Sequence, residues 1–171
     1  MVTEDVVARV VSYIQHQGAK TPDDLAALVG ESQQRLFEVM SGVPEDVATR
    51  SPAEGEWSVR QLLLHVIDAE RGVTRLVERL ARGEEVTREP APGVVAADDG
   101  RPYAALIDEL RAANTGMVEM VRSLTDDRNL TVKAPHPFFG PLNCAEWAAF
   151  QRVHDADHIQ HAEKILAAVR V

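Results

Sequence analysis

The chain has 171 residues, of which 45% are hydrophobic and 26% charged, and its formal net charge is −9 at pH 7. This composition is typical of a globular protein with one sizeable core and excludes a disordered chain. Because an acidic surface repels nucleic-acid phosphates and anionic membranes, we expect neither nucleic acid nor a membrane as a partner.

Targeting and membrane-spanning segments are not evident in the sequence. Cys144 is the only cysteine, which excludes an intrachain disulfide. The residues after Met1 lack the basic stretch and apolar run of a signal peptide, and no apolar run approaches the ~20 residues that span a bilayer. We therefore expect a cytoplasmic protein.

Helical periodicity begins close to the start of the chain. Residues 4–17 form a short amphipathic pattern, with several valines and Ile14 on one side. Thr21 is a suitable N-cap for a second helix, with Pro22 in its first turn, and this helix is predicted to end near Ser41. Its apolar residues recur at helical spacing: Leu25, Leu28, Val29, Leu36 and Met40.

The clearest periodicity lies in the middle of the chain. Ser58 is a good N-cap, and a regular apolar pattern follows it up to about Gly83. The pattern alternates steps of three and four residues: Val59, Leu62, Val66, Ala69, Val73, Leu76 and Leu80. Residues 84–102 are rich in proline and glycine and are predicted to form a long loop, and a further helix is predicted for residues 103–124.

A last helix is predicted after a second loop, residues 125–142. Asn143 caps this helix, which runs to about Val169, and no strand-like alternation persists anywhere in the sequence. Four long helices after a short one predict an all-α protein, an antiparallel four-helix bundle. We expect residues 1–171 to form a single domain in which residues 1–20 are the extra N-terminal helix.

Two histidines on the last helix form a pattern that suggests chemistry. His154 and His158 are four residues apart, so they lie about 40° apart on one face and one turn apart. Trp147, Phe150 and Ile165 share this face, which should therefore point into the bundle. Two imidazoles at this spacing can bind one ion. The alternative is a pair of core histidines that hydrogen-bond to backbone carbonyls.

A metal site needs a third ligand, and His65 is the best candidate. It borders the apolar stripe of its helix and can point across the bundle to the last helix. His161 lies ~10.5 Å along the helix axis from His154, too far for one ion to bind all three histidines of that helix. His136 lies in a proline-flanked loop and is expected at the mouth of a pocket. Three histidines with an open fourth position suit zinc or nickel, with iron or manganese as alternatives.

Several segments of the chain resemble a known family. Residues 57–65 (WSVRQLLLH) resemble the segment that opens the second helix of the DinB-like, or YfiT-like, bundle superfamily. Residues 136–142 (HPFFGPL) resemble the last loop of that family. Residues 146–158, which begin with EW and end with HDADH, resemble its last helix. The resemblance covers roughly residues 24–169.

The resemblance implies a four-helix bundle with a three-histidine metal site. The ligands of the family would fall on His65, His154 and His158, the residues that the helix geometry also favours. The family often has glutamine three residues after the last ligand, where this chain has His161. This departure leaves the three ligands in place and changes their surroundings.

The resemblance also implies candidate activities. Relatives include metal-dependent transferases that use low-molecular-weight thiols, and a thiol-dependent maleylpyruvate isomerase. We therefore predict a metal-dependent enzyme with a small-molecule substrate, preferably a low-molecular-weight-thiol-dependent S-transferase. The alternatives are a metal-dependent hydrolase and a non-catalytic metal-binding stress-response bundle. The two long loops favour an enzyme, because loops of that length often cover a site.

The other polar side chains near the predicted ligands are weaker candidates. Arg60 or Arg152 could hold the carboxylate of a thiol cofactor. Asp157 could orient an imidazole, although we expect it to be a solvated or salt-bridged carboxylate, like Asp68 and Glu70. Finally, the leading helix carries apolar side chains that the bundle need not absorb, which predicts a homodimer.

Overall fold

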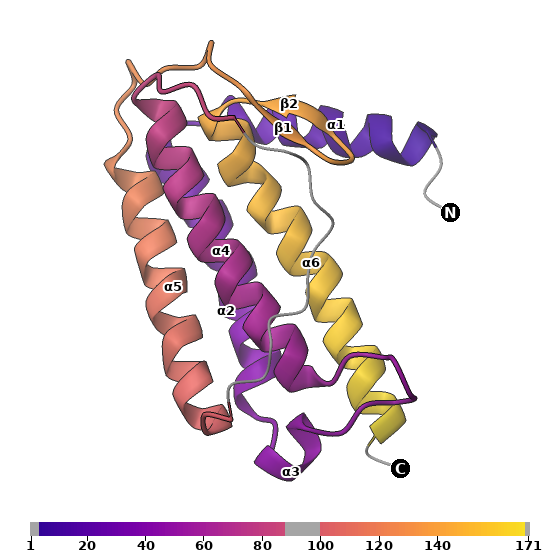
Figure 1. Cartoon of the computed structure of the whole chain (residues 1–171). Coiled ribbons are helices and arrows are strands. Elements are labelled where there is room, and N and C mark those ends of the chain that lie inside the picture. Colours follow the sequence, from indigo (N-terminus) through magenta and orange to yellow (C-terminus); the bar gives the residue numbers. More distant parts are fainter. Residues whose placement is uncertain (1–3, 88–99, 170–171) are drawn as a thin grey trace.

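Four long helices form a bundle in the computed structural model, which describes residues 4–87 and 100–169 (Figure 1). Helices α2 (Pro22–Ser41) and α6 (Cys144–Val169) run in one direction, and α4 (Val59–Ala81) and α5 (Tyr103–Ser123) run in the other. Helix α2 packs against α5 and α6, and α4 likewise packs against α5 and α6. The predicted all-α four-helix bundle is confirmed. Within the described residues, no helix combines the length and apolarity needed to cross a membrane.

Helices α2, α4 and α6 begin where the sequence predicts, because the N-cap of each is satisfied by a residue close to it in the chain. Thr21 Oγ1 accepts a hydrogen bond from the backbone N–H of Asp24. Ser58 and Gln61 form a capping box, in which each side chain bonds the backbone N–H of the other residue, at 3.2 and 2.9 Å. Asn143 caps α6 in the same reciprocal way, with Glu146 as its partner. The three predicted N-caps are therefore confirmed.

The connections hold structure that the sequence did not indicate. A short helix, α3 (Glu45–Ala48), interrupts the loop before α4. In the loop before α6, strands β1 (Ala134–His136) and β2 (Gly140–Leu142) form an antiparallel hairpin, which no alternating pattern in the sequence indicated. Strands of three residues are too short to show an alternating pattern. Gly140 has φ of +74°, a backbone conformation that favours glycine at this turn.

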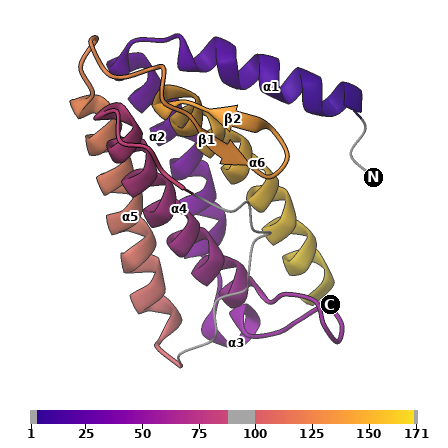
Figure 2. The same ribbon diagram turned by 45° about the horizontal axis from the view of Figure 1, so that its top comes forward.

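The leading helix, α1 (Glu4–Gly18), crosses the end of the bundle beside the hairpin (Figure 2). Its residue Ile14 is fully buried. A Cβ atom at Gly18 would come within 3.2 Å of Glu146, so the absence of a side chain lets α1 approach the first turn of α6 closely. The start of α1 is less covered, and Val6 is 38% exposed.

The core consists of two hydrophobic clusters separated by buried polar side chains. Ser32 and Gln33 lie in α2 between the apolar residues of the two clusters, as Glu70 does in α4 and as Gln151 and Asp155 do in α6. We call these five residues the polar layer. It crosses the interior of the bundle at the part of α6 that carries His154.

Candidate metal centre

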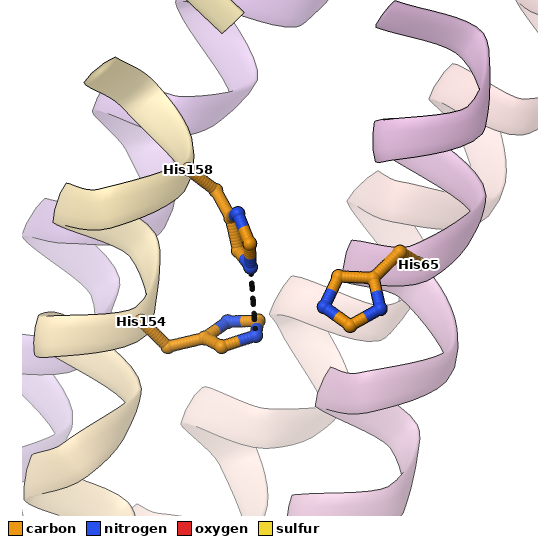
Figure 3. Close-up of side chains that lie close together, drawn as sticks. All are labelled: His65, His154 and His158. Carbon is orange, nitrogen blue, oxygen red and sulfur yellow. Dashed lines mark hydrogen bonds between the residues drawn. The ribbon is translucent and has the colours of Figure 1, made fainter. Parts of the chain in front are cut away.

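The structure brings the three predicted metal ligands together. His65 projects from α4 toward α6, and His154 and His158 project from α6 toward α4 (Figure 3). Each of the three residues offers one potential ligand atom, and these three atoms all lie within 4.8 Å of one another. Within the described residues, this is the group of three or more histidine, cysteine or acidic side chains placed to share an ion. That these three histidines bind an ion stays a prediction.

The spacing of the imidazole rings is suited to a single ion. The Nε2 atoms of His154 and His158 lie 3.1 Å apart. The His65 ring centre lies 5.6 Å from that of His154 and 5.0 Å from that of His158. Two nitrogen ligands at roughly 2.0–2.1 Å from a tetrahedral zinc ion lie about 3.3 Å apart. The α6 pair therefore needs little movement to bind one.

Burial keeps the two α6 imidazoles neutral. Burial, followed by the neighbouring rings of His158 and His65, lowers the pKa of His154 well below its usual value. Burial and His65 lower the pKa of His158 to about 4. Within the described part of the chain, the Nδ1 atoms of both rings have no hydrogen-bond partner. Neutral imidazoles are the form that binds a metal ion.

His161 lies beside the cluster but outside it. Its ring centre is 6.3 Å from that of His158 and 5.7 Å from that of Trp57. Trp57 also contacts His65, at 5.2 Å between ring centres. Trp57 thus packs against one candidate ligand, His65, and against His161.

His136 has a structural role in the hairpin. It lies in β1, and its Nδ1 accepts hydrogen bonds from the backbone N–H groups of Phe138 and Phe139, at 3.1 and 3.3 Å. Its ring stacks on Phe139 and lies 4.4 Å from that of Phe150, between ring centres. His136 is thus buried in the hairpin, whereas the sequence predicted a loop residue at the mouth of a pocket.

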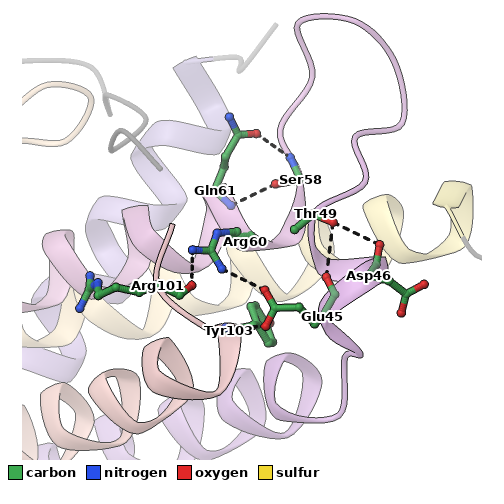
Figure 4. A network of polar contacts seen from close by, with 8 residues as sticks. All are labelled: Glu45, Asp46, Thr49, Ser58, Arg60, Gln61, Arg101 and Tyr103. Atoms are coloured by element: carbon green, nitrogen blue, oxygen red, sulfur yellow. Dashed lines mark hydrogen bonds and ion pairs between the residues drawn. The ribbon is translucent and has the colours of Figure 1, made fainter. Parts of the chain in front are cut away.

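Arg60, one of the two arginines considered for a thiol cofactor, is engaged in a polar network (Figure 4). Its buried guanidinium pairs with Glu45 of α3 at 3.3 Å and donates to the backbone carbonyl of Arg101. Glu45 in turn accepts a hydrogen bond from the backbone N–H of Tyr103, at 2.7 Å. Arg60 therefore holds α3 and the start of α5 against α4.

Arg152, the other arginine, faces α2. It pairs with Glu31 at 2.9 Å and donates to the carbonyl of Leu28, so it lies at the α2–α6 contact while the histidines face α4. Asp157 is exposed, as expected. Burial raises the pKa of the Cys144 thiol, which disfavours its reactive thiolate form.

The polar layer contains two carboxyl groups that sequence reasoning did not place there. Asp155 accepts hydrogen bonds from Ser32 Oγ at 2.6 Å and from Gln151 Nε2 at 2.8 Å. Gln33 Nε2 donates to Glu70, and both carboxyl groups are fully buried. Burial raises the pKa of Asp155 to about 7. Burial, and then the Asp155 charge, raises the pKa of Glu70 to about 9.

The expectation that Glu70 is solvated is therefore wrong. Glu70 is buried in the interior of the bundle, where Gln33 of α2 donates a hydrogen bond to it. The available signal was its place four residues after Val66 and three before Val73, both in the apolar stripe. Asp155 points to α2 because it lies about 100° around the helix from His154.

Comparisons with known proteins agree with this architecture. A family profile described as the DinB superfamily matches residues 28–162. The chain is 24% identical over 137 residues to a protein of Oceanobacillus iheyensis named "Putative metal-dependent hydrolase OB0413", with 78% of each chain covered.

The chain also resembles solved structures. TT2238, described as a four-helix bundle protein, superposes with a TM-score of 0.59 and 23% identity, over 84% of this chain and 99% of that one. YfiT from Bacillus subtilis superposes with a TM-score of 0.63 and 18% identity, over 84% and 85% of the two chains. It is described as "a probable metal-dependent hydrolase with an unusual four-helix bundle topology". At these identities, both likenesses show the fold.

Proposed function

The chain belongs to the DinB superfamily, and from that premise we propose that it is a metal-dependent hydrolase of small molecules. The ligands of its divalent ion are His65, His154 and His158. The observation that carries the proposal is the convergence of these imidazoles from two helices, with ligand atoms within 4.8 Å of one another. The descriptions of two relatives as metal-dependent hydrolases support the class of reaction.

The protein holds the three ligands on two packed helices. His154 and His158 are held on one face of α6, and His65 is held on α4, within the same packed bundle. Three imidazoles suit zinc, nickel, iron or manganese better than calcium or magnesium, which prefer oxygen ligands. A divalent ion with three protein ligands lowers the pKa of water or a thiol at its open position and so supplies a nucleophile near neutral pH.

Thiol-dependent S-transfer, which the resemblance favours, stays a prediction. The two arginines considered for a thiol carboxylate are engaged in ion pairs with Glu45 and Glu31. Hydrolysis requires no such second binding group, since water is the co-substrate. We therefore rank hydrolysis first and make S-transfer an outcome of the same experiment.

The test compares the two reactions on one preparation. Metal-free protein is loaded with zinc, nickel, iron(II) or manganese and assayed with a panel of esters and amides. It is assayed in parallel with glutathione, mycothiol or bacillithiol and electrophilic acceptors. We expect metal-dependent hydrolysis without thiol, lost in His158→Ala and kept in His16→Ala, a control exposed on α1.

Each other outcome has a distinct meaning. Turnover only with a thiol would replace the hydrolase proposal with the S-transferase. Bound metal without turnover of either kind would favour the non-catalytic metal-binding bundle. Hydrolysis that survives in His158→Ala would place the reaction elsewhere in the chain.

A further inference from the structure

A series of aromatic rings connects the hairpin to the histidine cluster. Phe138, at the hairpin turn, is 69% exposed and is the most exposed large hydrophobic side chain among the described residues. Its ring centre lies 6.4 Å from that of Phe139, which lies 6.0 Å from that of Phe150. Phe150 in turn lies 5.8 Å from His154. We call the three phenylalanines the ring series.

The ring series is placed to contact a molecule bound at the histidines. Phe150 precedes His154 by four residues on α6, so both side chains lie on the same face, one turn apart. Phe139 and Phe150 are only partly buried, which leaves part of each ring uncovered by the core. Ring centres 4.5–7 Å apart, the separations found here, are also those at which a further aromatic group would pack.

The opposite flank of the cluster is organised differently. Trp57 contacts both His65 and His161, at 5.2 and 5.7 Å between ring centres. Its aromatic surface therefore packs against imidazoles. The ring series also packs against an imidazole, since the His136 ring centre lies 4.7 Å from that of Phe139 and 4.4 Å from that of Phe150. Unlike Trp57, however, it extends away from the cluster and ends at the exposed Phe138.

We propose that the ring series binds an aromatic group of the substrate, which makes the substrate an aryl or arylalkyl carboxylic ester or amide. This inference rests on the proposed function, because the scissile carbonyl must reach the ion held by the histidines. The aromatic group would then extend from the histidines toward the hairpin and pack against Phe150.

The test uses metal-binding probes that require no turnover. Zinc-loaded protein is titrated by calorimetry with benzohydroxamate and with cyclohexanecarbohydroxamate, which has a ring of similar size that is not aromatic. We expect about 2- to 10-fold tighter binding of the aromatic probe, the range that ring packing provides. Phe150→Leu, which keeps an apolar side chain, should abolish the difference.

Two further variants make the result specific. Phe138→Ala, at the exposed turn, should weaken the aromatic preference without affecting folding. Leu130→Ala is the matched control, since Leu130 is also exposed, at 43%, and lies outside the ring series. It should leave the preference unchanged.

The failures are distinguishable. A chain that takes up no zinc overturns the proposed function and this inference with it. A zinc-loaded chain that binds both probes equally overturns the inference alone. So does an aromatic preference that survives in Phe150→Leu and disappears in Trp57→Leu, because that result assigns the aromatic group to the other flank.

Discussion

Histidines in this chain differ in what surrounds them, and that difference separates the candidate ligands from the rest. His154 and His158 are paired on one helix face, and burial lowers the pKa of each. His136 is engaged with the backbone of its own hairpin. His161 packs on Trp57, and His16 is exposed.

Removal of one ligand should abolish stoichiometric metal binding. We expect about one ion per chain in the native protein. His65→Ala, His154→Ala or His158→Ala should each lose it, because two imidazoles leave the ion mostly hydrated. Elemental analysis by mass spectrometry after desalting measures the content.

His161→Ala is the control for that series, because it removes a neighbouring imidazole and leaves the three ligands. It should keep the full metal content. Full occupancy in His158→Ala, or loss in His161→Ala alone, would contradict the assignment of the ligands.

At the scale of elements, α6 serves two different purposes on two faces. One face carries His154 and His158 toward α4, and another carries Gln151 and Asp155 toward α2. Because the helix is buried on several sides, its apolar pattern is less regular than that of α4. The N-caps, by contrast, depend only on neighbouring residues.

Loss of the capping box should destabilise α4. In Ser58→Ala, the backbone N–H of Gln61 loses its acceptor, and the free energy of unfolding should fall by about 1 kcal/mol. Urea denaturation measures the change, with Ser51→Ala as an exposed control in the preceding loop. An equal effect of the two substitutions would show that the capping bond contributes nothing measurable.

Glu70 should make the bundle less stable as the pH rises. Its pKa is about 9 in the folded protein and lower when unfolded, so the folded state retains a proton that the unfolded chain releases. The stability due to this group is therefore complete at acid pH and is lost as the pH rises from about 4.5 to 9. Above about pH 7.5, the Asp155 carboxyl group is mostly ionised, so Glu70 contributes most of the remaining pH dependence of stability from this pair.

Glu70→Gln isolates this effect. In metal-free native protein, the free energy of unfolding should fall between about pH 7.5 and 9, by at most ~1.4 kcal/mol per pH unit. In Glu70→Gln, the free energy of unfolding should fall little over this range. The variant should therefore be more stable than the native protein near pH 9. Asp68→Asn, an exposed carboxylate on the same helix, should keep the native slope. An unchanged slope in Glu70→Gln would mean that Glu70 is already ionised in the folded state.

At the scale of the whole molecule, α1 lies at one end of the bundle and contacts mainly α6. Its second half is anchored by Ile14 and by the close approach at Gly18. Its first half carries Val6, which is exposed, and Val7 and Val10, which are half-buried.

We expect these valines to complete a homodimer, since apolar side chains on an exposed helix commonly mark a contact surface. Light scattering at micromolar concentration should give the mass of two chains. Val6→Glu should shift the mass toward one chain, whereas Leu130→Glu, at another exposed apolar position, should not. A native protein that scatters as a single chain would contradict the prediction.

The sequence by itself determined helices α1, α2, α4, α5 and α6, the N-caps of α2, α4 and α6, and the shared face of His154 and His158. These features follow from contacts between residues a few positions apart, such as Ser58 with Gln61, which repeat with the period of the helix. His65 was also identified from its place beside an apolar stripe, because a residue there can face a neighbouring helix. The hairpin was missed, since its two strands of three residues are too short for a periodic pattern.

Only the tertiary structure decided which polar residues are buried. Glu70 meets Gln33, and Ser32 meets Asp155, across 37 and 123 residues of chain. Arg60 similarly acquires its role from Glu45 and from the backbone at Arg101. A carboxylate or guanidinium has the same local sequence signal whether it is solvated or buried. Its environment depends on which helix packs over it, and that arrangement is set by long-range contacts rather than by its neighbours in the chain.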